Sequence, residues 1–212
     1  MGMRVDGDSA AARAPALRVV GVPGSLRRAS LNRALLRAAR ELAPHGLRID
    51  IEELHAVPLF NADLDGPEAP AGVVRLRHAV SAADGLLLVT PEYNHGVPGV
   101  LKNAIDWLSQ PRRGNVLDRK PTAMMGASTG PAGTARGQMQ LRQSFVLTNT
   151  PVMLQPEILV GRAQEKFDSE GRLVDPTTRQ YVAEFLLQFD RFIREQLRAR
   201  AAAPSDVSPT VA

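Results

Sequence analysis

Five short apolar segments alternate with segments of helical periodicity along this chain of 212 residues. Residues 85–90 (GLLLVT) are the clearest of the five, because apolar side chains at successive positions require cover on both faces of a strand. The other four expected strands are residues 17–22, 47–51, 122–127 and 156–160. Repeated alternation of strand and helix predicts an α/β fold, with a parallel sheet between two layers of helices.

The apolar spacing predicts helices at residues 31–42, 73–83, 101–108, 133–147 and from 175 onward, and a small hairpin at residues 167–173. Five parallel strands fit the flavodoxin-like three-layer sandwich, whose strand order is 2-1-3-4-5. In that topology a ligand binds at the carboxyl ends of strands 1 and 3. The loops after Val22, Thr90 and Ala127 are therefore expected to carry the function.

One domain is expected over residues 17–198, between a flexible N-terminal extension (residues 1–16) and a flexible C-terminal tail (residues 199–212). The first 15 residues lack the apolar run of a signal peptide, and no segment has the length of a membrane span. We therefore expect a cytoplasmic protein.

Composition excludes several kinds of chemistry. The chain has no cysteine, so it has no disulfides, no thiolate nucleophile and no cysteine-ligated metal. Its net charge is only +4 and aromatic residues make up 4%, which argues against a nucleic-acid partner. The positive charge is local, however. Five arginines and no acidic residue occur between residues 27 and 40, where they would attract an anionic cofactor.

The first loop, residues 24–32 (GSLRRASLN), predicts an anion site. It is neither a dinucleotide fingerprint nor a Walker A loop. Ser25 and Ser30 offer hydroxyl donors, Asn32 an amide, and Arg27 charge-assisted hydrogen bonds, all beside the free N–H groups of a helix start. The plainer alternative is that Ser30 only caps the helix and that the arginines are solvated.

The second loop, residues 90–99 (TPEYNHGVPG), contains two prolines and two glycines. This composition makes the loop stiff and lets its backbone approach a planar ring closely. Pro91 and Tyr93 are candidates to cover part of that ring. His95 is given no catalytic role, because a single loop histidine is more often a surface or hydrogen-bonding residue.

Residues 24–32 together with residues 91–109 (PEYNHGVPGVLKNAIDWLS) resemble the NADPH-dependent FMN reductase family, and within it the quinone, azo-dye and chromate reductases. Residues 128–136 (STGPAGTAR) and 140–143 (QLRQ) agree with this resemblance, which covers nearly all of residues 17–198. The resemblance implies that FMN is bound by three loops: its phosphate by Ser25, Arg27, Ser30 and Asn32, its ring and ribityl chain by Pro91, Glu92, Tyr93 and Asn94, and its remaining edge by Ser128, Thr129 and Gly130.

The resemblance also implies that NADPH or NADH gives a hydride to bound FMN, which then reduces a quinone, a flavin, an azo compound or a metal oxyanion. No catalytic side chain and no metal are expected, because the flavin carries the chemistry. The alternative is a flavodoxin-like electron-transfer protein reduced by a partner protein, which the basic charge disfavours. We further expect a homodimer or homotetramer, with Trp107 near the interface. Candidate contacts of the NADPH 2′-phosphate are Arg112, Arg113 and Arg136.

Overall fold

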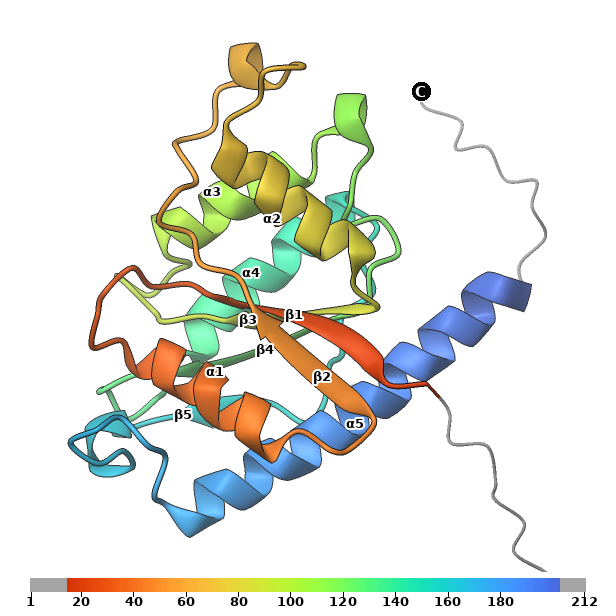
Figure 1. Cartoon of the computed structure of the whole chain (residues 1–212). Helices are drawn as coiled ribbons and strands as arrows, with labels where there is room; N and C mark the ends of the chain where they lie inside the picture. Colours follow the sequence, from red (N-terminus) through yellow and green to blue (C-terminus); the bar gives the residue numbers. More distant parts are fainter. Residues whose placement is uncertain (1–14, 203–212) are drawn as a thin grey trace, which may run out of the picture.

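The computed structural model describes residues 15–202. Its centre is a five-stranded sheet in which every neighbouring pair is parallel. The strands are β1 (Leu17–Pro23), β2 (Leu47–Ile51), β3 (Gly85–Val89), β4 (Thr122–Ala127) and β5 (Ile158–Val160). They lie in the order β2-β1-β3-β4-β5 (Figure 1), which confirms the expected flavodoxin-like topology.

Two layers of helices enclose this sheet. The helices are α1 (Leu31–Leu42), α2 (Ala71–Ala82), α3 (Gly99–Leu108), α4 (Ala135–Leu147) and α5 (Pro176–Ala202). α1 and α5 cover one face, and α2, α3 and α4 cover the other (Figure 1). The three-layer sandwich predicted from the alternating pattern is therefore confirmed.

The central strand β3 shows why both faces must be apolar. Its side chains alternate, so that Leu87 and Val89 enter the core beneath α1 and α5, whereas Leu86 and Leu88 enter the core beneath α2, α3 and α4. All residues of β3 and β4 are buried. Residues 85–90 are thus continuously apolar because helices cover both faces of this strand.

The expected ends of some elements need correction. α5 continues to Ala202, so four residues assigned to the C-terminal tail belong to this helix. Residues 1–14 and 203–212, most of the two expected flexible segments, lie outside the described residues. The hairpin at residues 167–173 is present as an antiparallel bridge between Phe167 and Leu173. No helix among residues 15–202 is long and apolar enough to cross a membrane.

Trp107 does not support the expected interface, because this chain already buries it. The side chain is 0% exposed, and its indole N–H donates to the Pro58 carbonyl at 2.8 Å. Phe60 meets the ring edge-on at 5.0 Å between centroids, and the Arg77 guanidinium lies 5.8 Å from the ring centroid. The interpretation of Trp107 as an interface residue was therefore wrong. An apolar residue at the end of a helix stripe has the same pattern whether it packs inside or outside the chain.

The carboxyl ends of β1, β3 and β4 meet along one edge of the sheet. Gly24 N–H donates to the Val89 carbonyl at 2.8 Å, and Thr90 N–H donates to the Met125 carbonyl at 2.9 Å. The three loops that follow these strands therefore begin side by side.

Candidate active site

The first loop is organised around the Ser25 hydroxyl. Ser25 is 4% exposed, and its oxygen accepts the Arg27 backbone N–H at 3.4 Å. The same hydroxyl lies 3.4 Å from the Tyr93 hydroxyl of the second loop. The Arg27 guanidinium donates to the Ala29 carbonyl at 3.2 Å, so the side chain folds over its own loop. This contact leaves most of the five guanidinium N–H donors of Arg27 for a ligand.

Ser30 begins α1 as its N-cap. Its hydroxyl oxygen accepts the Arg33 N–H at 3.2 Å, as the plainer alternative predicts. The hydroxyl hydrogen remains a donor. Within residues 15–202, the backbone N–H groups of Leu31 and Asn32 have no hydrogen-bond acceptor. The first turn of α1 therefore presents the donors and the positive end of the helix dipole that an anion requires.

The Asn32 side chain joins the first loop to the third. Its oxygen accepts the Ala127 N–H and its amide nitrogen donates to the Ala127 carbonyl, both at 2.8 Å. Asn32 is only 3% exposed. The predicted phosphate contact through this amide is thus reduced to its second N–H, because the rest of the group fastens the end of β4.

A two-residue turn holds the second loop. Tyr93 and Gly96 exchange backbone hydrogen bonds of 3.1 and 2.9 Å, and Asn94 and His95 between them have φ values of 51° and 61°. Positive φ at both central residues is typical of a type I′ turn. The loop is further fixed by Gln140 of α4, whose side-chain oxygen accepts the Val97 N–H at 2.7 Å.

Glu92 uses its carboxylate to fasten this loop to α4. One oxygen accepts the Gly137 N–H at 2.9 Å in the first turn of the helix, where a negative charge is favourable. The other lies 3.7 Å from the Arg136 guanidinium. A Cβ on Gly137 would lie 3.3 Å from the Gly96 carbonyl oxygen, so the glycine permits this close approach. Glu92 therefore lines the site with a carboxylate that already has partners.

The third loop is largely self-satisfied. Ser128 N–H donates to the Val160 carbonyl at 2.9 Å, and Gly130 N–H donates to the Ser128 hydroxyl at 3.2 Å. Among residues 15–202, the Thr129 N–H has no acceptor. Of the backbone N–H groups of Ser128, Thr129 and Gly130, that of Thr129 is therefore the one left for a ligand.

The three loops together form one cleft of about 240 Å³. It brings together nine of the eleven predicted site residues: Ser25, Arg27, Ser30, Asn32, Pro91, Glu92, Tyr93, Ser128 and Thr129. Asn94 and Gly130 do not line it. Leu31 and Ala127 do line it, and they were missed because neither has a polar side chain. The cleft is smaller than the range of about 300–1,000 Å³ that is typical of sites enclosing a whole ligand, so part of a ligand the size of FMN would stay outside it.

The arginines of residues 27–40 are divided among different surroundings. Only Arg27 lines the cleft. Arg28 and Arg37 line a separate hollow next to it, and Arg33 pairs with Glu53 at 2.6 Å. The positive charge available to a bound anion therefore comes mainly from Arg27 and the start of α1. The other arginines of residues 27–40 contribute less than their number in the sequence indicates.

Comparisons with known proteins agree on one family. The family model of the NADPH-dependent FMN reductases matches residues 17–165. An NAD(P)H-dependent FMN reductase of Pseudomonas aeruginosa is 41% identical over 178 residues, covering 84% of this chain and 96% of that protein. A quinone reductase of Escherichia coli K12 is 39% identical over 185 residues, covering 84% and 96%. The structure of the flavoenzyme FerB, an NAD(P)H:acceptor oxidoreductase of Paracoccus denitrificans, has a TM-score of 0.77 at 33% identity, covering 85% and 98%. The chain belongs to the NADPH-dependent FMN reductase family.

Proposed function

We propose that the cleft between the three loops binds FMN and that the chain uses it to pass electrons from NAD(P)H to a small-molecule acceptor. The family makes the chain an oxidoreductase that depends on FMN and NAD(P)H. The observation that carries the assignment to this cleft is its set of unused donors. The hydroxyls of Ser25 and Ser30, the Arg27 guanidinium and the free N–H groups at the start of α1 all belong to residues that line it.

These donors match a phosphate monoester. Its dianion accepts hydrogen bonds only, and a helix start supplies both N–H groups and a favourable dipole. Arg27 adds the charge-assisted contact. Because Ser25 and Ser30 are 4% and 5% exposed, they meet the phosphate with little competition from water. The residues present therefore fit the phosphate end of FMN.

Other lining residues fit the flavin ring. Pro91 and Tyr93 offer an apolar surface, and the Thr129 N–H offers a hydrogen bond. FMN, when bound, supplies the redox chemistry, accepting a hydride from the nicotinamide and passing electrons to the second substrate. The protein has to hold the ring in place, and the Glu92, Asn32 and Gln140 contacts keep the three loops fixed for that purpose.

A quinone is the acceptor class that we propose first, with flavins, azo compounds and metal oxyanions as further acceptors. One similar protein, from E. coli, is named a quinone reductase, and another, from Burkholderia, is named a 2-hydroxy-1,4-benzoquinone reductase. The shallow cleft, with Tyr93 48% exposed, leaves room for flat molecules of different shape over the ring. Steady-state turnover with NADPH and NADH across a panel of these acceptors tests the proposal. Absence of quinone turnover with either nicotinamide would contradict it.

We also propose that two or four copies associate. One support is that this chain alone does not enclose the whole cleft. The other is that α4 exposes three apolar side chains: Met139 is 64% exposed, Val146 84% and Leu147 92%. Sedimentation analysis measures the number of copies, and a monomer at micromolar concentration would contradict this proposal. The cytoplasmic location and the absence of a nucleic-acid partner stay predictions.

For the NADPH 2′-phosphate, Arg112, Arg113 and Arg136 stay the candidates. Arg136 already pairs with Glu92, but its side chain is 56% exposed. Replacing each of the three in turn and comparing KM for NADPH with KM for NADH identifies the contact. An unchanged ratio in all three variants would exclude them.

A further inference from the structure

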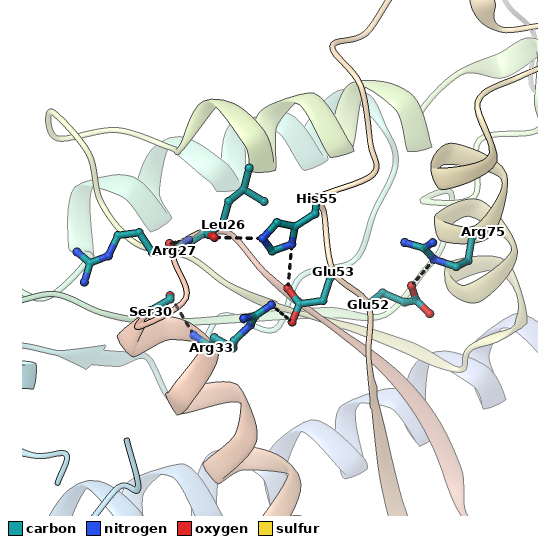
Figure 2. A network of polar contacts seen from close by, with 9 residues as sticks. Leu26, Arg27, Ser30, Arg33, Glu52, Glu53, His55 and Arg75 are labelled. Carbon is teal, nitrogen blue, oxygen red and sulfur yellow. Dashed lines mark hydrogen bonds and ion pairs between the residues drawn. The ribbon is translucent and has the colours of Figure 1, made fainter. Parts of the chain in front are cut away.

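Two residues after β2, Glu53 and His55, reach back to the phosphate-binding loop and the start of α1, and neither was singled out from the sequence. Figure 2 shows His55 between the first loop and Glu53. The His55 Nε2 lies 3.1 Å from the Leu26 carbonyl oxygen, and its Nδ1 lies 3.8 Å from the Glu53 Oε2. One imidazole ring thus connects the loop that contains Ser25 and Arg27 with a carboxylate behind it.

Glu53 also holds the far side of the same loop. Its Oε1 lies 2.6 Å from the Arg33 guanidinium, and Arg33 donates its backbone N–H to the Ser30 hydroxyl (Figure 2). The second oxygen, Oε2, is buried yet has no hydrogen-bond partner within residues 15–202. A single carboxylate therefore touches both supports of the loop, and one of its oxygens lacks a donor.

The protonation state of His55 decides whether that donor exists. A carbonyl oxygen only accepts, so Nε2 must carry a hydrogen to bond Leu26. In the neutral ring, Nδ1 then turns a lone pair toward the Glu53 carboxylate, which is unfavourable. In the protonated ring, Nδ1–H points at the Oε2 that lacks a partner, and both contacts become hydrogen bonds or ion pairs with matching partners.

Other charges around the ring do not replace this effect. Arg33 is held by Glu53 itself, and Glu52 is paired with Arg75 at 3.2 Å. Arg27 follows Leu26 in the loop and faces the cleft. Of the groups in this network, the imidazole is therefore the one that can present either a lone pair or an N–H toward Glu53.

We propose that His55 and Glu53 are positioning residues for the FMN phosphate, and that protonation of His55 fixes the loop and tightens FMN binding. This inference rests on the proposed function. Protonated His55 holds the Leu26 carbonyl in place, which sets the position of Ser25 and Arg27 on either side of it. Its positive charge also lies beside the loop that meets a phosphate dianion, so both effects act in the same direction.

The experiment measures the dissociation constant for FMN between pH 5.5 and pH 8.5, by quenching of flavin fluorescence on the full chain freed of flavin. Free FMN also titrates, because the second ionisation of a phosphate monoester lies near pH 6. The informative quantity is therefore the difference between proteins at each pH. His55→Gln keeps an N–H donor toward Leu26 but cannot become charged, and Glu53→Gln removes the carboxylate. His78→Gln, at an exposed position of α2, is the matched control.

Exposed ion pairs contribute little free energy, so the expected effect is small. When the pH is lowered from 8.5 to 5.5, the FMN dissociation constant of the wild type should fall by about two- to fivefold more than that of His55→Gln. Glu53→Gln should lose the part that acts through the loop but keep the direct effect of the charge on His55, so its pH profile should lie between those of the wild type and His55→Gln. His78→Gln should follow the wild type. Riboflavin, which lacks the phosphate, should show a smaller difference between the proteins.

Parallel pH profiles for the wild type, His55→Gln and Glu53→Gln would overturn the inference while leaving the proposed function intact. If His55→Gln does not fold, as judged by its thermal transition, the Glu53→Gln profile decides alone. Failure of the wild type to bind FMN at any pH would overturn the proposed function, and this inference with it.

Discussion

Replacing Asn32 by alanine should reduce both stability and FMN affinity. The change removes two hydrogen bonds of 2.8 Å and leaves the N–H and C=O of Ala127 without partners at a residue that is 2% exposed. A hydrogen bond contributes about 1 kcal/mol net, and a buried polar group left unpaired costs more. The free energy of unfolding should therefore fall by about 2–4 kcal/mol, a large part of a typical total of about 5–15 kcal/mol.

Urea unfolding of the flavin-free protein measures this loss. With a slope near the upper end of the usual range, about 3 kcal/mol/M, the midpoint should fall by about 0.7–1.3 M while the slope stays constant. Asn61→Ala is the matched control, because its side chain accepts one hydrogen bond at an exposed position, from Asp63 N–H at 2.9 Å. If Asn32→Ala unfolds at the same midpoint as Asn61→Ala, the Asn32 amide does not join the loops as described.

Three further predictions follow from single contacts. Arg27→Ala should weaken FMN binding by about ten- to a hundredfold and riboflavin binding far less, because its contact is with the phosphate; equal losses for the two ligands in calorimetric titrations would refute this. Trp107→Phe should lower the free energy of unfolding by about 2 kcal/mol through the lost bond to Pro58 and the lost Arg77 contact, without changing the number of associated copies in sedimentation analysis; a change of oligomeric state would restore Trp107 as an interface residue. Asp175 directly precedes α5 and accepts hydrogen bonds from the Thr178 side chain and from the Thr178 backbone N–H, which lower the pKa of the carboxyl. A carboxyl whose pKa is lower in the folded state contributes stability above its unfolded value of about 3.9, and that contribution is lost as the pH falls through the folded value. Melting temperatures between pH 6 and pH 2.5 should therefore fall more steeply for the wild type than for Asp175→Asn, and identical slopes would refute the role of Asp175.

The fold was predictable because its pattern is local. Each buried strand had to be apolar on both faces, as residues 85–90 are, and each helix showed its own spacing. The positions of the loops at the site followed from topology, since the carboxyl ends of β1 and β3 are neighbours in this strand order. Nine of the eleven expected residues accordingly line one cleft.

The roles of individual side chains were less predictable because they depend on contacts between distant residues. Asn32 meets Ala127, and Glu92 meets Gly137, at separations that no spacing rule covers. Trp107 finds its partners at Pro58 and Phe60, in a long loop without apolar periodicity. Nothing in the sequence pointed to a role for His55 or Glu53, since that role depends on a contact between His55 and Leu26, which lies 29 residues earlier in the chain.

Anaerobic reduction of the FMN-loaded protein by NADPH tests whether the chain passes electrons from a nicotinamide through its flavin. We expect a yellow protein whose flavin absorbance is lost on addition of stoichiometric NADPH or NADH and returns when a quinone is added. Bleaching by dithionite but by neither nicotinamide would contradict it and would favour an electron carrier reduced by a partner protein.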